Sequence, residues 1–98
     1  MNLIEHIITD YKSGTTVKLY LHSNVMKLTN LQTPLDNRNM GGARRVMLKA
    51  IALAGDLPIE LIILPDDDTD WDRLYIFYRQ FGFKSVPGNK AMMRRDNK

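Results

Sequence analysis

The residues best placed to do chemistry lie in the segment Arg38-Asn39-Met40-Gly41-Gly42-Ala43, between a strand-like run and a helix-like run. The first turn of a helix carries backbone N–H groups without intrahelical acceptors and the positive end of the helix dipole, so it can bind phosphate. Small residues in this segment would let a pyrophosphate approach the backbone closely. The small residues are Gly41, Gly42 and Ala43, and the neighbouring cations are Arg38, Arg44 and Arg45. The segment therefore predicts a phosphate site, although the same residues would suit a tight turn with solvated arginines.

The flanking runs place this segment between a strand and a helix. Residues 28–33 alternate between apolar and polar character, and residues 34–37 then have turn-forming types. Apolar residues recur at three- and four-residue intervals from Val46 to Ala54, and the pattern ends at Gly55, where a glycine typically follows a helix. The segment lacks the Gly-Lys-Ser/Thr of the P-loop and the three glycines of the dinucleotide-binding turn. The pattern predicts a strand, a glycine-containing turn and a helix.

The rest of the chain predicts further strands and a second helix. The expected elements are a short helix over 3–11, strands over 16–22 and 25–33, a strand over 59–64, a helix ending near Phe81, and strands over 83–86 and 91–95. For 3–11 the β-branched residues keep a strand possible. The continuous apolar run 59–64 favours a strand buried on both faces and parallel to 25–33. Asp68 or Thr69 would cap the helix that follows.

Two stretches resemble the signatures of the GNAT (Gcn5-related) N-acetyltransferases. Arg38 to Ala43 fits the first signature, Arg/Gln-x-x-Gly-x-Gly/Ala. Leu74 to Lys84 is similar to the second, in which a tyrosine, here Tyr78, stands four residues before a Gly-Phe pair. The resemblance covers roughly residues 16 to 95. It implies an α/β (α+β) GNAT-like mixed sheet in a single domain over 1–98, with an antiparallel hairpin, a β-α-β crossover with splayed parallel strands, a second helix and a C-terminal hairpin.

The resemblance also implies a site for acetyl-CoA, used as a cosubstrate without a metal. The pantetheine arm would pair with the backbone of the first splayed strand at Leu31, Gln32 and Thr33. The pyrophosphate would be bound by Arg38, Asn39, Met40, Gly41, Gly42, Ala43 and Arg44. Tyr78 would act as general acid, since a phenol with a pKa near 10 suits a thiolate with a pKa of about 8.5. The competing interpretation is a core tyrosine with a satisfied hydroxyl.

The sequence does not identify the general base. An alkylammonium must lose a proton before it attacks, yet the strand over 25–33, where many relatives carry a glutamate, contains no carboxylate. Asp70-Trp71-Asp72 also stands where the family usually has an asparagine. The candidate bases are His22, Glu60, Asp66 and Asp67.

The layout of the C-terminal half is similar to that of a small phage-type anti-CRISPR acetyltransferase, which modifies a lysine on a CRISPR nuclease. This similarity rests on Leu57-Pro58 through Pro65, Asp67-Asp68, the aromatic helix and Met93-Arg94. We therefore expect an N-acetyltransferase whose acceptor is a lysine or the N-terminus of a protein. One alternative is a catalytically inactive CoA-binding or protein-interaction module with the same fold. A third is a basic nucleic-acid-binding protein that uses Arg38, Arg44, Arg45, Arg94 and Arg95.

Composition narrows the classes of protein to which this chain could belong. A hydrophobic content of 44% and a charged content of 26% are typical of one ordinary globular domain. The absence of cysteine excludes disulfides and thiolate metal sites, and His6 and His22 do not suggest a zinc site. A net charge of +3 suits an anionic ligand without requiring nucleic acid. With neither a membrane-length apolar run nor a signal-like start, we expect a cytoplasmic protein.

Overall fold

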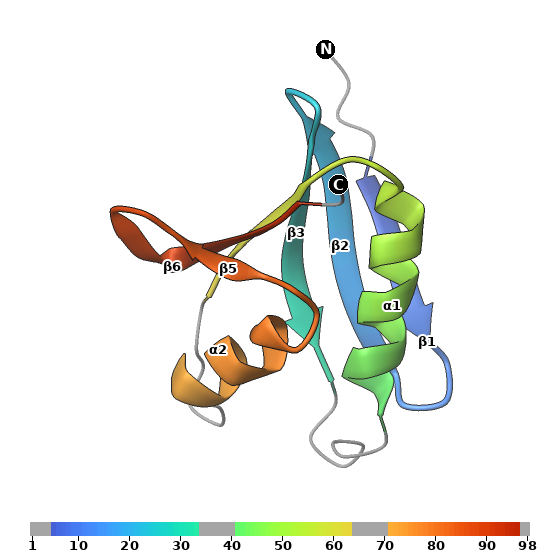
Figure 1. Cartoon of the computed structure of the whole chain (residues 1–98). Coiled ribbons are helices and arrows are strands. Elements are labelled where there is room, and N and C mark those ends of the chain that lie inside the picture. The colour runs from blue at the N-terminus through green and yellow to red at the C-terminus, as the bar shows by residue number, and fades with distance from the viewer. Residues whose placement is uncertain (1–4, 34–40, 64–70, 97–98) are drawn as a thin grey trace.

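Two helices and a six-stranded mixed sheet make up the described part of the chain. The computed structural model describes residues 5–33, 41–63 and 71–96. The strands are β1 (Glu5–Asp10), β2 (Thr15–His22), β3 (Val25–Gln32), β4 (Ile59–Ile62), β5 (Lys84–Val86) and β6 (Asn89–Arg95), and the helices are α1 (Gly42–Ala54) and α2 (Trp71–Arg79) (Figure 1). The mixed α+β class predicted from the sequence is confirmed.

The strand order in the sheet is β1-β2-β3-β4-β6-β5. Neighbouring strands are antiparallel except β3 and β4, which are parallel and are joined through α1. Ser23 and Asn24 connect β2 to β3 with φ angles of 51° and 63°, the left-handed conformation that a two-residue hairpin turn requires. The predicted hairpin, the crossover and the closing β5–β6 hairpin are therefore confirmed.

The N-terminal segment is a strand, so the predicted helix over 3–11 is wrong for the residues that the structure describes. β1 pairs with β2 in antiparallel register along its whole length, from Glu5 opposite Tyr20 to Asp10 opposite Thr15. Ile8 packs partly against the core, whereas Ile7 points to the other face and is 61% exposed. Pairing with β2 thus outweighs the helical spacing, and the β-branched side chains favour the extended backbone.

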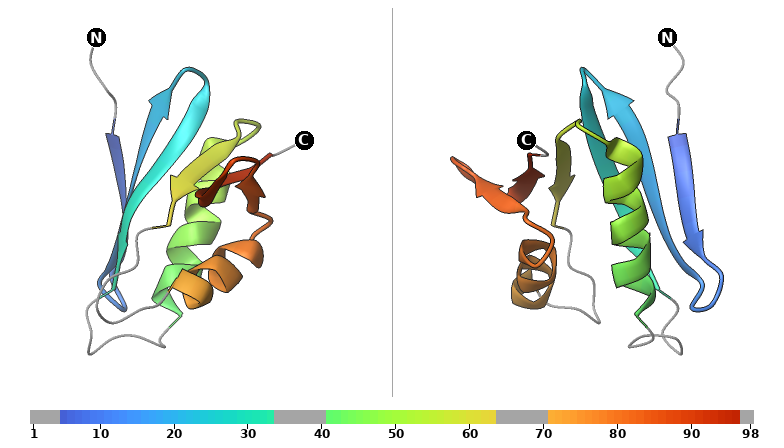
Figure 2. Two further views of the ribbon diagram at one scale, coloured as in Figure 1. Left: turned by 90° about the vertical axis from the view of Figure 1, so that its left-hand side faces the viewer. Right: turned by 45° about the vertical axis from the view of Figure 1, so that its right-hand side comes forward.

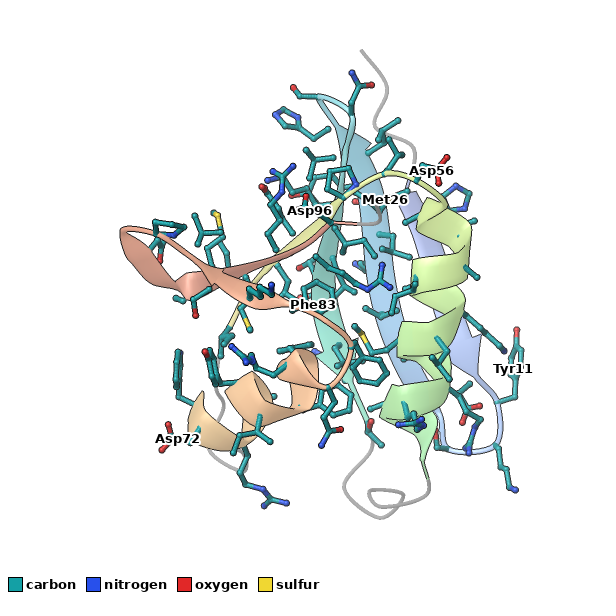
Figure 3. The ribbon with its side chains drawn as sticks, in the orientation of Figure 1. Tyr11, Met26, Asp56, Asp72, Phe83 and Asp96 are labelled. Carbon is teal, nitrogen blue, oxygen red and sulfur yellow. The ribbon has the colours of Figure 1, made fainter. Side chains whose placement is uncertain are left out.

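The hydrophobic core lies between one face of the sheet and the two helices (Figure 2). Alternate residues of the strands point into it, as Val17 and Leu19 of β2 do, while Val46 and Met47 face it from α1. Phe83, fully buried, lies at its centre (Figure 3). As expected, α1 ends at Gly55, whose φ is 60°.

Only one face of β4 is buried, which corrects the prediction of burial on both faces. Ile59 and Leu61 are buried in the core, whereas Ile62 is 52% exposed and Glu60 is partly exposed. The reason is that α1 and α2 pack on the same side of the sheet. α2 ends at Arg79, two residues earlier than expected.

No helix among the described residues is long and apolar enough to cross a membrane.

Candidate functional site at the break between β3 and β4

The parallel ladder between β3 and β4 is short. It pairs Met26 with Ile59, Lys27 with Glu60, and finally Leu28 with Leu61. Beyond that pair β3 runs on to Gln32, and the two strands diverge (Figure 1). We call this divergence the ladder break. In the described part of the chain, the edge of β3 after Leu28 therefore presents backbone N–H and C=O groups without β4 partners.

A β-bulge lies in β3 at the ladder break. The register pairs Lys18 with Thr29 and Thr16 with Gln32, so three steps along β3 match two steps along β2. Asn30 has a φ of 55°, a left-handed conformation that asparagine tolerates better than most residues. Because an extra residue bends a strand and increases its twist, the bulge explains why β3 turns away from β4 here. The only sequence signal was an asparagine inside an otherwise strand-like run.

The N-terminus of α1 is an open helix end. Gly41 is its N-cap, with a φ of 77°, and makes no side-chain capping hydrogen bond to the first turn. No acidic residue occupies that first turn, and Gly41 is exposed. These N–H groups and the positive end of the helix dipole are therefore suited to an anionic ligand.

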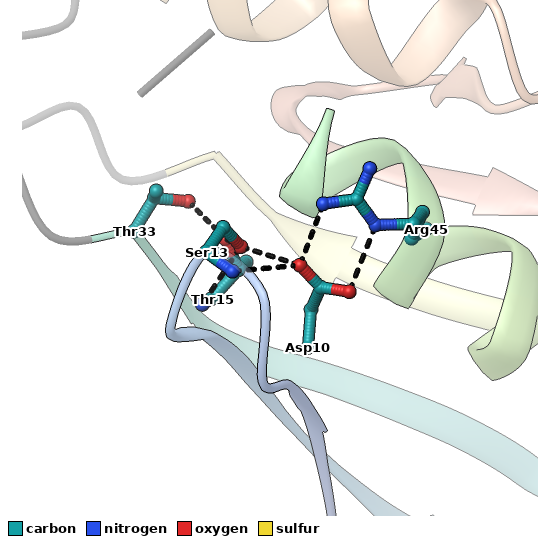
Figure 4. A network of polar contacts seen from close by, with 5 residues as sticks. All are labelled: Asp10, Ser13, Thr15, Thr33 and Arg45. Carbon is teal, nitrogen blue, oxygen red and sulfur yellow. Dashed lines mark hydrogen bonds and ion pairs between the residues drawn. The ribbon is translucent and has the colours of Figure 1, made fainter. Parts of the chain in front are cut away.

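Gly42 is a glycine for a packing reason. A Cβ added there would lie 1.9 Å from the Oγ of Ser13 and 2.3 Å from the Oγ1 of Thr15. Ser13 Oγ and Thr15 Oγ1 are 2.7 Å apart, and Thr15 Oγ1 is 2.8 Å from Thr33 Oγ1 (Figure 4). The start of α1 therefore packs against a chain of hydroxyl groups that ends at Thr33, the residue that follows β3.

Asp10 completes this polar network. The carboxylate accepts hydrogen bonds from Arg45 Nε and Nη2, both at 2.8 Å, and from Ser13 Oγ at 2.6 Å (Figure 4). The Arg45 guanidinium and the Ser13 hydroxyl hold the pKa of Asp10 well below its usual range. Arg45, expected beside a pyrophosphate, is therefore engaged with Asp10 and serves first to anchor α1.

Arg44 points the other way. Its guanidinium lies 6.0 Å from the centre of the Phe81 ring, just past the end of α2, and the side chain is exposed. No carboxylate pairs with it among the residues that the structure describes. Arg44 is thus the available cation on the first turn of α1. Arg38, Asn39 and Met40, which were predicted to share this site, lie outside the described residues.

Tyr78 is a buried phenol, 6% exposed. Its ring packs edge-on against Phe77 and Phe83, with centroid distances of 5.4 and 6.0 Å, in the same core as Leu28 and Leu61 of the last ladder pair. No hydrogen-bond partner for its hydroxyl occurs within the described residues, and burial raises the pKa of Tyr78 to about 12. The ring packs as a core residue does, but its hydroxyl has no hydrogen-bond partner among the described residues.

Neither candidate base that the structure describes is suited to accept a proton at the ladder break. Glu60 accepts hydrogen bonds from Lys27 Nζ and, at 2.9 Å, from Arg94 Nη1, and both cations, Lys27 most, lower the pKa of Glu60. A carboxylate so stabilised in its charged form is a weak base. His22 is exposed at the turn end of the β2–β3 hairpin, opposite Val25. Asp66 and Asp67 lie outside the described residues.

The other predicted ligands lie on both sides of the candidate site. Leu31 and Gln32 follow the ladder break on β3, Thr33 comes directly after the strand, and Leu31 is partly packed against the core. Ala43 is partly exposed on the first turn of α1. No group of three potential metal ligands forms within 5–33, 41–63 and 71–96.

Three of the arginines suggested for a nucleic-acid patch are held by partners within the fold. Arg45 bonds to Asp10, Arg94 bonds to Glu60 and Asp96, and Arg95 Nε donates to the Phe81 carbonyl at 2.7 Å. Arg44 also lies at Phe81, over its ring, and Arg38 lies outside the described residues.

Comparison with known proteins gives one informative likeness. No protein family and no curated protein matches the chain. Among solved structures, the crystal structure of the anti-CRISPR protein AcrVA5 matches with a TM-score of 0.71 and 18% sequence identity, covering 96% of this chain and 98% of that one. At this identity the likeness establishes a shared fold over essentially the whole chain.

Proposed function

We propose that this protein is a minimal GNAT-type N-acetyltransferase that transfers an acetyl group from acetyl-CoA to an amine of a protein. The observation that supports it most is that the ladder break and the open N-terminus of α1 lie together. Gly42 of α1 packs closely against the Ser13 and Thr15 hydroxyl groups, and Thr15 is hydrogen-bonded to Thr33, so that helix end lies beside the end of β3. One extended ligand could therefore use both.

Acetyl-CoA has the chemistry that these two features would recognise. Its pantetheine arm carries amides that can pair with the unpaired edge of β3 at Leu31 and Gln32, as a further strand would. Its pyrophosphate suits the exposed first turn of α1 at Gly41, with Arg44 adding charge. The thioester would then lie near the last ladder pair, Leu28 and Leu61, which belong to the same hydrophobic core as Tyr78.

Acetyl transfer moves one proton from the amine to the thiol. The neutral amine attacks the thioester carbonyl, the C–S bond breaks, the nitrogen loses a proton and the sulfur gains one. Tyr78, with its pKa raised to about 12, stays protonated at neutral pH and can donate a hydrogen bond to the departing sulfur. Complete transfer from the phenol to a thiolate of pKa about 8.5 would be uphill, so we expect the phenol to stabilise the departing sulfur by a hydrogen bond, while water takes the amine's proton and returns one to the sulfur.

A protein acceptor is supported by the fold neighbour, which is named an anti-CRISPR protein. The resemblance of this sequence to small acetyltransferases of that kind supports the same acceptor class.

The test is calorimetric titration with acetyl-CoA and with adenosine 3′,5′-bisphosphate at two salt concentrations. We expect saturable binding that requires the pantetheine arm and is lost in Gly41→Glu, because that substitution places a negative charge at the helix end. Gly88→Glu is the matched control, since Gly88 also has a positive φ, 84° against 77°, but lies in the β5–β6 turn. Equal binding by both variants would reject the site. Binding without acetyl transfer to any lysine-bearing acceptor would indicate an inactive CoA-binding module.

A further inference from the structure

The sheet has a second face over which neither described helix lies. Cross-strand pairs place Glu5, Tyr20, Lys27, Glu60, Arg94 and Lys84 in one row across it, from β1 to β5. The register puts these side chains on the face opposite the core. We call this the open face of the sheet.

Polar contacts on this face leave two lysines, Lys84 in this row and Lys18 in the next, without a described carboxylate partner, while Glu5 stands at the β1 end of the row. Glu60 is shared by Lys27 and Arg94, so its charge is already compensated. Lys84 lies opposite Arg94, and Lys18 occupies the next row. Neither of these two lysines has a carboxylate partner in the part of the chain that the structure describes. The open face therefore presents two uncompensated cations.

The next row of the open face combines apolar side chains with one lysine and one threonine. It contains Ile7, Lys18 and Thr29 on one side of the ladder break and Ile62 and Met92 on the other. Ile7 is 61% exposed and Ile62 is 52% exposed. A partner that covers these exposed isoleucines would remove apolar surface from water, which lowers the free energy of the complex.

The open face is hollowed at its β5–β6 end. A pocket of about 380 Å³ is lined there by Lys84 and Arg94 together with the apolar side chains of Val86 and Pro87. Asp96, paired with Arg94, also lines it. A partner side chain with a carboxylate at its end could enter this pocket and approach Lys84.

We propose that the open face is a docking surface for a protein segment in which acidic and apolar side chains alternate. Acidic side chains would pair with Lys18 and Lys84, and apolar ones would cover Ile7 and Ile62. This proposal concerns binding and does not depend on acetyl transfer. Because the ladder break separates Thr29 from Ile62 within this face, a docked segment would lie beside it.

Charge and side-chain type distinguish this occupant from two others. A second copy docked through the same face would bring Lys18 and Lys84 towards like charges. A nucleic acid would gain little from the isoleucines, since base stacking uses aromatic rings and Tyr20 is the only aromatic residue in the two described rows.

The test is an NMR titration of the amide resonances with three probes. These are a short peptide alternating Glu and Leu, the same peptide with Lys in place of Glu, and a short DNA duplex. We expect the acidic peptide to shift resonances of β1, β2, β4 and β5 saturably, because these strands carry Ile7, Lys18, Ile62 and Lys84. The double variant Lys18→Glu/Lys84→Glu should weaken its binding about tenfold. The control Lys12→Glu/Lys49→Glu, which makes the same charge change at exposed positions on the β1–β2 turn and α1, should bind as the parent does.

Several results would overturn the proposal. They are no shift of these strands at millimolar acidic peptide, equal binding of the Lys peptide, or tighter binding of the DNA on the same strands. So would a concentration-dependent dimer that is abolished by Ile62→Glu but not by Leu48→Glu, the matched change on α1, where Leu48 is 50% exposed.

Discussion

Arg45 holds Asp10 in a two-bonded ion pair, with Nε 2.8 Å from Oδ1 and Nη2 2.8 Å from Oδ2. The pair joins the first turns of α1 to the end of β1, residues 35 positions apart in the chain. Planar bidentate pairs of this kind fix orientation as well as contributing energy. The position of the helix end at the candidate site therefore depends on a carboxylate far from it in sequence.

We predict that Asp10→Asn lowers the melting temperature by several degrees at neutral pH and makes stability less sensitive to acid. Unfolded aspartate has a pKa near 3.9, and the pKa of folded Asp10 lies lower, so the parent's extra stability is present above about pH 4 and is lost below it. Thermal unfolding from pH 2 to 7 measures this. Parallel curves for parent and variant would show that the pair contributes no stability.

Gly42→Ala should destabilise the protein by about 1–3 kcal/mol, because the new methyl group would overlap the Ser13 and Thr15 hydroxyl groups. Urea denaturation measures the loss. Adding Ser13→Gly removes the nearest atoms, so the double variant should be more stable than the sum of the two single changes predicts, by about 1 kcal/mol. Strict additivity would mean that Gly42 is not constrained by this contact.

The strands and helices were largely predictable because local patterns specify them. The alternation of apolar and polar residues predicted β2, whose residues are alternately buried, and Gly55 predicted the end of α1. β1 was not predictable, because an edge strand with Ile7 exposed has no clear alternation of buried residues. Its pairing with β2 decides its structure, and pairing is not a local property of the sequence.

The candidate site was predictable only where one short segment forms it. The turn before α1 and the tyrosine of α2 have recognisable spacing. The contacts that position them, such as Thr15 to Thr33 across 18 residues, join distant parts of the chain. Likewise, the engagement of Arg45 by Asp10 and of Glu60 by Lys27 changes what these side chains can do, and neither follows from residue type.

Glu60→Gln should leave acetyl transfer within about threefold of the parent, with the same pH profile, because a carboxylate held ionised by Lys27 and Arg94 is not a general base. Stability should fall, since the two cations would lose their shared carboxylate. Steady-state kinetics across pH, together with thermal unfolding, measure both effects. Asp96→Asn, which removes the other carboxylate bonded to Arg94, is the control. A loss of a hundredfold or more in turnover, with loss of an acid-side ionisation, would restore Glu60 as the base.

Tyr78→Phe should separate stability from catalysis. Removing a buried hydroxyl without a described partner should raise the free energy of unfolding by about 1 kcal/mol. The stability of the variant should also depend less on alkaline pH. Burial raises the pKa of Tyr78 from 10.0 to about 12, so the phenol ionises first in the unfolded chain, and the parent loses stability as the pH rises from 10 towards 12.

Acetyl transfer by the same variant should fall about a hundredfold while the affinity for acetyl-CoA is unchanged, because the hydroxyl would act only on the departing sulfur. Calorimetry, turnover and denaturation on one preparation measure the three quantities. Tyr75→Phe, on the same helix but with its hydroxyl 3.5 Å from Arg79 Nη1, is the matched control and should keep most of the turnover. A catalytic hydroxyl should be dispensable for folding and required for the reaction. A variant that loses stability but retains turnover would therefore show the opposite, namely that the Tyr78 hydroxyl makes a stabilising hydrogen bond and takes no part in catalysis.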